Sequence, residues 1–310
     1  MNETKGQEQN KRSCISMIAE NLDRSKDIAG VALLWLLDRH VEKKGIACAT
    51  GGVKMLDLEH PVFGTVSPDV HLLVPGQTGD DDRIVMITRK LAFTVETATR
   101  ALFSARVLKV FAHESWVLFP SNSVKEAPAD LREFVKAECA FHGIGLLAIP
   151  RKCKAISDAE EIVPAKLQQD GGAGIHDRDL VLDPARARGV AAAIRFVNDL
   201  QAAIEVHLQH GEARVQSVTI SIDGAWTCFL QGPAGGRNYR LEITPTREAT
   251  VFLLYDFFGP DSRSPSLPFS KQLPPGPGLI AGMVEYIASS IDSISKSEKL
   301  RGEFMRNLQF

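Results

Sequence analysis

The pattern of apolar and polar positions divides the first half of the chain into alternating helical and extended segments. Apolar residues recur at helical spacing between Ser25 and Lys43, and Gly45 ends that segment. Short runs rich in Val, Ile and Leu come next, and such runs predict β-strands. The strands are expected at Val53–Glu59, Val70–Val74, Arg83–Arg89, Ser115–Phe119 and Gly143–Ile149, and further helices at Val95–Ala112 and Ala127–Phe141.

The order of these segments predicts an α/β fold. The first three strands lie close enough in the chain to form antiparallel hairpins. The later strands alternate with helices, which favours parallel crossover connections. We therefore expect a mixed sheet flanked by helices in residues 25–155, after a disordered N-terminus at 1–24.

The second half predicts a smaller α+β domain at 184–310. A charged, glycine-containing segment at 156–183 is expected to be a linker. The stretch Gly259–Gly278 holds six prolines and is expected to lack regular structure. The expected elements are helices at Pro184–His210 and Leu279–Ser293, with strands at Val215–Ile222, Thr227–Leu230, Tyr239–Ile243 and Thr250–Phe257.

Composition narrows the classes of function. The chain has 310 residues and a formal net charge of −2, so any contact with nucleic acid must come from a local basic patch. The five cysteines form no C-x-x-C pair, which favours reduced thiols in a cytoplasmic protein over a zinc ribbon or a disulfide framework. The most apolar run, Ile28–Leu37, is too short to span a bilayer, so no membrane segment is expected.

The segment around Val70–Arg89 is the most informative for chemistry. Two β-rich flanks enclose a loop rich in turn residues, which predicts a hairpin. If Val74 pairs with Arg83, then Asp69 lies opposite Thr88 and on the same face of the sheet. A shift of the register by one residue would separate them.

Lys90 is the next position on that face, so a carboxylate, a hydroxyl and an ammonium group would meet at the open end of the hairpin. Carboxylates hold Mg²⁺ through oxygen, and the ion polarises a phosphate and activates water. A lysine stabilises the charge that develops on the phosphate. The group is therefore suited to metal-dependent cleavage of a phosphodiester.

The sequence Pro68-Asp69, then a hairpin and then Thr88-Arg89-Lys90, resembles the signature of the PD-(D/E)XK nuclease superfamily. The strand at Trp116–Phe119 and the Gly-Ile-Gly-Leu run at Gly143–Leu146 extend the resemblance over about residues 25–150. The resemblance implies a restriction-endonuclease-like core, hydrolysis of DNA with Mg²⁺, and Asp69, Thr88 and Lys90 at the catalytic positions.

The chain departs from the family at one catalytic position, because the second acid falls on Thr88. Some branches of the family supply a glutamate from the next helix, and this implies Glu96 as a catalytic residue and as a metal ligand beside Asp69. Glu59 on the first strand is another candidate. A site with Asp69 alone would hold Mg²⁺ poorly, which leaves open a degenerate derivative that binds DNA without cutting it.

Each of these residues also has a purely structural interpretation. Asp69 suits a turn after proline, Thr88 is an ordinary strand residue, and Lys90 suits a surface position at a strand end. Glu96 in a first helical turn complements the helix dipole. Consecutive acids at Asp80–Asp82 are interpreted as a solvated loop.

The sequence is compatible with three functions. The first is a nuclease, or a derivative that only binds DNA. The second is a non-catalytic scaffold or interaction protein within a defence or mobile-element complex, with protein partners and a homodimer both compatible with the sequence. The third is an enzyme with its site in residues 215–258, but that part of the chain shows no nucleophile elbow, metal-ligand spacing or dinucleotide fingerprint.

Overall fold

The computed structural model describes the chain as two compact units, Met1–Ile194 and Arg195–Phe310. The described residues are 28–42, 49–53, 55–76, 82–153, 156–167, 180–207, 214–231, 237–245, 250–258, 269–273 and 280–285. The predictions of a disordered N-terminus at 1–24 and of a solvated loop at Asp80 and Asp81 lie outside them.

The first unit contains a mixed sheet with six described strands. They are β1 (Thr50–Val53), β4 (Val70–Val74), β5 (Arg83–Arg89), β6 (Glu114–Pro120), β7 (Gly145–Ile149) and β8 (Glu160–Val163), adjacent in that order. β1, β4 and β5 pair antiparallel in turn, β5, β6 and β7 pair parallel, and β8 returns antiparallel to β7.

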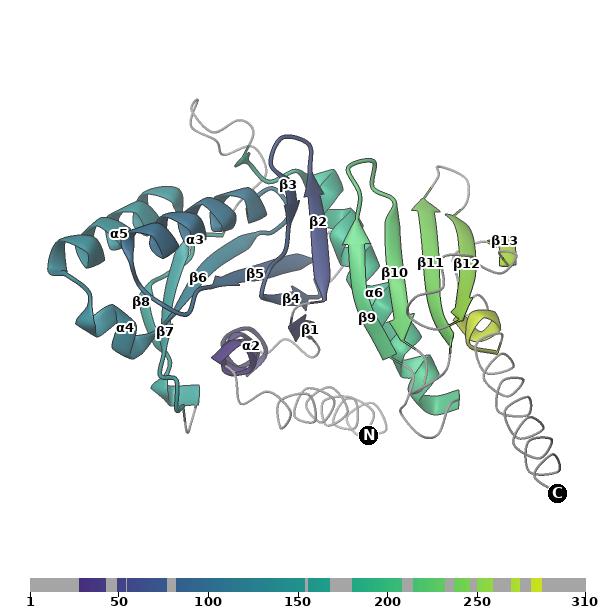
Figure 1. Ribbon diagram of the computed structural model, residues 1–310, viewed down its shortest axis with the longest axis horizontal. Coiled ribbons are helices and arrows are strands. Elements are labelled where there is room, and N and C mark those ends of the chain that lie inside the picture. The colour runs from purple at the N-terminus through teal and green to yellow at the C-terminus, as the bar shows by residue number, and fades with distance from the viewer. Residues whose placement is uncertain are drawn as a thin grey trace, which may run out of the picture. The chain divides into compact units, whose positions relative to one another are not determined.

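Helices cover both faces of this sheet (Figure 1). On one face lies α2 (Ile28–Leu37), with a short π-helical turn after it at Asp38–Glu42. On the other face, α3 (Val95–Leu108), α4 (Ser121–Glu126) and α5 (Ala129–His142) pack in a second apolar cluster. The predicted α/β fold, a mixed sheet flanked by helices, is therefore confirmed.

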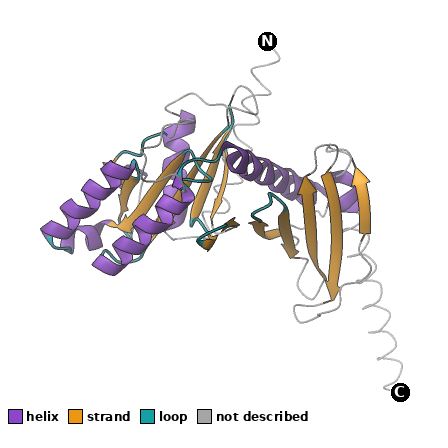
Figure 2. Ribbon diagram, turned by 90° about the horizontal axis from the view of Figure 1, so that it is seen from above, coloured by secondary structure: helices purple, strands orange, loops and turns teal. Residues whose placement is uncertain are grey.

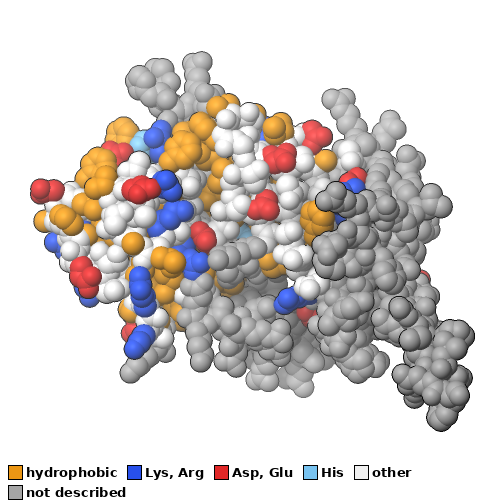
Figure 3. Space-filling model, viewed as in Figure 1, with side chains coloured by type: hydrophobic (Ala, Val, Ile, Leu, Met, Phe, Trp, Pro, Cys, Tyr) orange, Lys and Arg blue, Asp and Glu red, His pale blue; other side chains and the backbone are white. Residues whose placement is uncertain are grey.

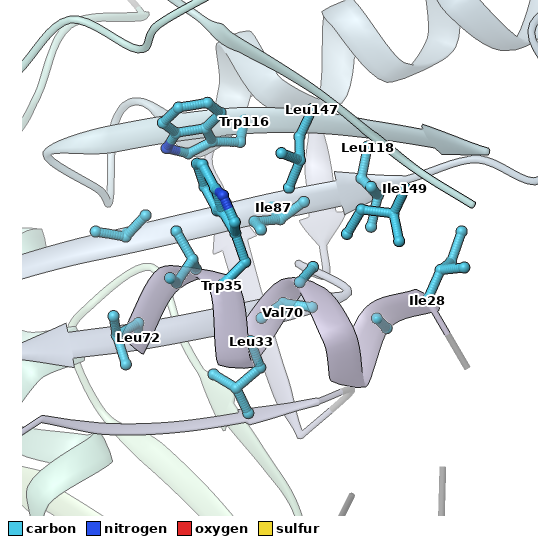
Figure 4. Packing of buried hydrophobic residues seen from close by; sticks show 14 of the residues in the cluster. Ile28, Leu33, Trp35, Val70, Leu72, Ile87, Trp116, Leu118, Leu147 and Ile149 are labelled. Atoms are coloured by element: carbon cyan, nitrogen blue, oxygen red, sulfur yellow. The ribbon is translucent and has the colours of Figure 1, made fainter. Parts of the chain in front are cut away.

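The core beneath α2 shows why these strands have continuous apolar sequences. All five residues of β4 are buried, as are all seven of β6, because helices cover the sheet on both sides. Figure 4 shows the side chains that meet between α2 and the sheet. They include Leu33 and Trp35 from the helix and Val70, Leu72, Ile87, Trp116, Leu118, Leu147 and Ile149 from four strands.

A tryptophan pair organises this core. The rings of Trp35 and Trp116 meet edge to face with centroids 5.1 Å apart. The guanidinium of Arg39 lies 5.1 Å from the Trp116 ring centroid and pairs with Glu161 on β8. A Cβ atom at Gly145 would lie 2.0 Å from the Trp116 ring, so only glycine fits beside it on the neighbouring strand.

The first predicted strand, Val53–Glu59, is wrong in its bounds. Two separate strands occupy this region, β1 and β2 (Leu56–His60), and β2 forms a hairpin with β3 (Gly64–Val66). β1 has no apolar pattern because it contains Gly51, where a Cβ atom would lie 2.6 Å from the His71 backbone oxygen on β4. The close approach of these two strands requires glycine there, and a strand built on glycine carries no hydrophobic signal.

The segment expected to be a linker, 156–183, contributes a strand to the sheet. β8 pairs with β7 and comes after a single turn of 3₁₀-helix at Ile156–Asp158. β8 begins with two exposed glutamates at the edge of the sheet, so its sequence resembles a charged loop.

The second unit, taken by itself, is an antiparallel sheet backed by a helix. Five strands are described here in the order β9-β10-β11-β12-β13, and α6 lies behind β9 and β10 in Figure 1 and along one side of the sheet in Figure 2. The Phe196 ring meets the Trp226 ring at 5.0 Å. The elements are α6 (Pro184–His207), which runs through the boundary between the units, β9 (Arg214–Ile220), β10 (Trp226–Gln231), β11 (Arg237–Pro245), β12 (Thr250–Phe258) and β13 (Phe269–Leu273).

β13 corrects the expectation that Gly259–Gly278 lacks regular structure. It lies between the third and fourth prolines of that stretch and pairs with β12, because the five residues Phe269–Leu273 contain no proline. The predicted final helix is described only at 280–285, which are helical. Among the described helices, none has the length and apolar character needed to cross a bilayer.

Candidate functional site

The β4–β5 hairpin has the register on which the sequence-based site depends. Val74 pairs with Arg83 and Val70 with Ile87, which is the last pair in the register. The backbone N–H of Asp69 donates to the carbonyl oxygen of Ile87 at 2.9 Å, one residue away from Thr88, the partner that this register would give it. Asp69 therefore lies just before β4 and beside the end of β5, where the regular pairing stops.

The carboxylate of Asp69 is bound by Arg89. Its Oδ2 accepts a hydrogen bond of 2.7 Å from the Arg89 backbone N–H, and its Oδ1 lies 3.8 Å from the Arg89 Nε. The Arg89 side chain is only 9% exposed and that of Asp69 is 22% exposed. The cation paired with Asp69 in the described part of the chain is thus Arg89, which the strand alternation assigns to the opposite face and which the sequence-based site did not include.

Thr88 lies in the core and not in an open site. The residue is 2% exposed, and its Oγ1 has no hydrogen-bond partner among the described residues. Lys90 is half-buried and continues the sheet, since its backbone N–H donates to the Leu118 carbonyl oxygen at 3.0 Å. Of the expected group, Asp69 and Lys90 are at the surface and Thr88 is sealed beneath it.

No described contact joins Asp69 to either of the two glutamates proposed as a second acid. Glu96 forms an ion pair with Arg100 at 2.8 Å across one turn of α3, and both side chains are about 70% exposed. Glu59 lies on β2, which is not among the six described strands of the Asp69 sheet. Within the described ranges, no group of three or more His, Cys, Asp and Glu side chains could hold a metal ion.

His71 is a buried titratable group two residues beyond Asp69. Burial lowers its pKa from 6.5 to about 4, so the ring is neutral at pH 7. Its Nδ1 has no described hydrogen-bond partner, and the ring lies over Gly52 of β1, where a Cβ atom would come within 3.0 Å. Its position against a glycine indicates packing as its role.

Asp82, the described member of the acidic run at Asp80–Asp82, has a structural role. It is buried, and its Oδ1 accepts a hydrogen bond of 3.0 Å from the Gly76 backbone N–H. That bond closes the base of the loop between β4 and β5. The expectation of a solvated acid is therefore wrong for Asp82.

The loop after Lys90 is fixed by the two neighbouring strand ends. Ser123 Oγ accepts from the Phe93 backbone N–H at 2.7 Å, and Arg151 Nη2 donates to the Leu91 carbonyl oxygen at 2.9 Å. Thr94 then caps α3 by accepting from the Thr97 backbone N–H. This loop is held at the edge where β5, β6 and β7 end.

Four basic residues come at or soon after the ends of β5, β6 and β7, and we call them the basic cluster: Lys90, Lys125, Arg151 and Lys152. Parallel strands bring their carboxyl ends to one edge of a sheet, where ligands of open α/β sheets bind. Lys125, Arg151 and Lys152 are exposed, and Lys90 is half-buried. In Figure 3, Lys and Arg side chains lie among Asp and Glu side chains on the part of the surface that the first unit forms. The signal in the sequence is the presence of a lysine or arginine soon after each of the three parallel strands.

Comparisons of the chain with protein-family models, with curated proteins and with solved structures found no match. The chemistry of the site must therefore be argued from its own residues.

Proposed function

We propose that the first unit is a nuclease-like module that binds duplex DNA without hydrolysing it. The observation that carries the proposal is the contact between Asp69 and Arg89 at the mouth of the hairpin. A carboxylate that already accepts a backbone N–H and lies beside a guanidinium has fewer free lone pairs for a metal ion, and the nearby positive charge opposes binding of a cation. Asp69 then serves to close the hairpin and to hold Arg89 in place.

Magnesium does not fit the side chains that gather here. The ion takes oxygen ligands in octahedral geometry and is usually held by one or two carboxylates together with substrate phosphates. Asp69 is the one carboxylate among the three motif residues, since Thr88 is buried and Lys90 is a cation. The Arg89 charge beside Asp69 also opposes a second cation. We therefore assign no hydrolytic step to this site.

The topology supports the nuclease-like part of the proposal. A helix precedes three strands that pair antiparallel in turn, and a further helix and a parallel strand come after them. This is the order that the PD-(D/E)XK resemblance implies for residues 25–150. Pro68-Asp69 lies at the start of the second of these strands and Lys90 at the end of the third.

The basic cluster supports DNA as the ligand. Phosphate contacts from Lys and Arg supply most of the affinity of DNA-binding proteins for duplex DNA of any sequence. Arg151 is positioned for this role because one of its nitrogens is held by the Leu91 carbonyl oxygen. The chain as a whole carries a net charge of −2, so binding depends on this local surface.

The test measures binding and cleavage of one labelled duplex by the full chain. We expect duplex binding by the wild type, weakening in Lys90→Ala and Arg151→Ala, and little change in Lys136→Ala, at a partly exposed lysine of α5 that is paired with Glu133. We expect no cleavage with Mg²⁺ or Mn²⁺. Unchanged folding of each variant is checked by circular dichroism.

Two outcomes would favour the alternatives. Metal-dependent cleavage that disappears in Asp69→Ala would restore the hydrolytic interpretation and direct the search for a second acid to Glu96 and Glu59. A protein that binds no duplex at low salt would leave the scaffold interpretation, in which the nuclease-like fold contacts other proteins.

A further inference from the structure

The sheet of the second unit has one face packed against α6 and an opposite face, whose described side chains belong to β9, β10 and β11. Buried residues of three strands, among them Cys228, Leu230 and Leu241, alternate with less buried ones. The buried set belongs to the face against α6, which lies behind the strands in Figure 1. The opposite face, which we call the open face, carries the alternate positions Ser217, Thr219, Thr227, Phe229, Gln231, Arg240 and Glu242.

An aromatic residue and an arginine occupy paired positions at the centre of the open face. Phe229 on β10 pairs directly with Arg240 on β11, and opposed residues of antiparallel strands share a face. The Phe229 residue is 39% exposed although it lies in the middle of its strand. The Arg240 side chain is 33% exposed, and its Nη2 lies 3.0 Å from Glu242 Oε1.

The row continues to a third strand. The register of β11 with β12 brings the position of Tyr255 opposite Arg240, so Phe229, Arg240 and Tyr255 occupy one line of positions across three strands. Adjacent strands lie about 4.8 Å apart, so this line is about 10 Å long. Arg214 lies one row further along the same face, where its guanidinium hydrogen-bonds Gln231 Oε1.

We propose that the open face of the second unit binds single-stranded nucleic acid. Exposed aromatic residues on a sheet stack against unpaired bases, and arginines contact the bases and the phosphates. The neighbouring Ser217, Thr227 and Gln231 supply hydrogen-bonding groups without charge. Glu242 is the one acid among the described positions of this face, which suits a polyanion.

The occupant is a single strand and not a duplex, because the bases of a duplex are already stacked and paired. A sheet face with Phe229 at its centre presents, among its described residues, no element that could insert into the major or the minor groove of a duplex. Single strands of DNA and of RNA both carry the unpaired bases and phosphates that this face would bind. The test therefore measures the two separately.

The test uses the full chain and measures the fluorescence anisotropy of labelled oligothymidylate and oligouridylate of about ten nucleotides, a length within the range bound by one such domain. We expect Phe229→Ala to weaken binding at least about five-fold, as loss of one stacked base predicts. Arg240→Ala should weaken binding and make its salt dependence shallower, while Arg240→Lys should restore only part of the affinity.

Ile222→Ala is the matched control, because Ile222 is an apolar residue 51% exposed in the turn after β9 and outside the open face. We expect it to bind like the wild type. Photo-crosslinking with bromouridine in place of uridine should label a peptide containing Phe229. Preference for one oligomer identifies the kind of single strand, DNA or RNA, that the face accepts.

The proposal is overturned if neither oligomer binds at low salt, or if both bind equally well to the wild type, Phe229→Ala and Arg240→Ala. It is also overturned if Phe229→Ala changes the sedimentation of the protein and not its binding, since the face would then be a contact between copies. Duplex binding through Lys90 and Arg151 is measured on the same proteins, so either proposal can fail without the other.

Discussion

At Thr88, the nuclease-like motif and the protein core require different side chains. The resemblance gives its position to an acid, yet the side chain is sealed and its Oγ1 has no described partner. Replacing an unsatisfied buried hydroxyl by a methyl group removes a desolvation penalty. We expect Thr88→Val to raise the free energy of unfolding by about 1 kcal/mol in urea denaturation.

Thr97→Val is the matched control, because the Thr97 hydroxyl caps α3 by accepting from the Thr94 backbone N–H and donating to the Ala92 carbonyl oxygen. We expect this variant to lose about 1 kcal/mol. A loss of stability in Thr88→Val as well would mean that a bound water or another group satisfies the Thr88 hydroxyl.

The register of the site could be predicted from the sequence, but its contacts could not. The turn residues between β4 and β5 are enough to pair Val74 with Arg83 and to bring Asp69 to the end of β5. The alternation of side chains along a strand assigns Arg89 to the face opposite Thr88 and Lys90. At the end of a strand the long arginine side chain nevertheless comes within 3.8 Å of Asp69, which no periodic pattern encodes.

His71 makes the stability of the first unit depend on pH. Burial lowers its pKa from 6.5 to about 4, so between these values the unfolded chain binds more protons than the folded chain. The free energy of unfolding should fall as the pH drops from about 6.5 towards 4, by at most about 1.4 kcal/mol per pH unit from this group.

The measurement compares urea denaturation of the wild type and His71→Leu at several pH values. Between about pH 6.5 and 4, the free energy of unfolding of the leucine variant should depend less on pH than that of the wild type, by the contribution of His71. The pH dependence that comes from other groups should remain. Parallel curves for the two proteins would show that the folded protein protonates His71 at its ordinary pKa.

At the scale of elements, glycines set how closely the strands and helices approach. Gly145 lies beside Trp116 on the next strand, and a Cβ atom would overlap its ring at 2.0 Å. We expect Gly145→Ala to lower the free energy of unfolding by at least about 2 kcal/mol, because Trp116 must leave its place against Trp35.

At Gly189, substitution by alanine should have the opposite effect on stability. It lies within α6, and a Cβ atom there would meet nothing within 4 Å. Gly189→Ala should therefore raise stability by about 1 kcal/mol through helix propensity. Equal effects of the two substitutions would show that Trp116 moves aside at little cost.

Three strands that the sequence did not reveal share a physical cause. β1 contains a glycine that lies against the β4 backbone, β8 is a charged strand at a sheet edge, and β13 lies among prolines. Each forms because a neighbouring strand offers hydrogen bonds, not because its own residues alternate. The central strands β4 and β5 have the predicted bounds because both their faces are buried.

At the scale of the whole molecule, a net charge of −2 opposes the approach of DNA. If the basic cluster of the first unit binds a duplex, a few local phosphate contacts must supply the affinity. The logarithm of the binding constant should then fall linearly with the logarithm of salt concentration, with a slope of about −0.9 for each phosphate neutralised.

The slope of this salt dependence reports how many side chains neutralise a phosphate, whereas the affinity at one salt concentration does not. Four cations in the cluster set an upper limit of about −3.6, and Lys90→Ala or Arg151→Ala should each make the slope shallower by about 1. Lys136→Ala on α5 should leave it unchanged. Variants that weaken binding with no change of slope would show that Lys90 and Arg151 shape the edge of the sheet without touching phosphate, and the duplex would have to contact another surface.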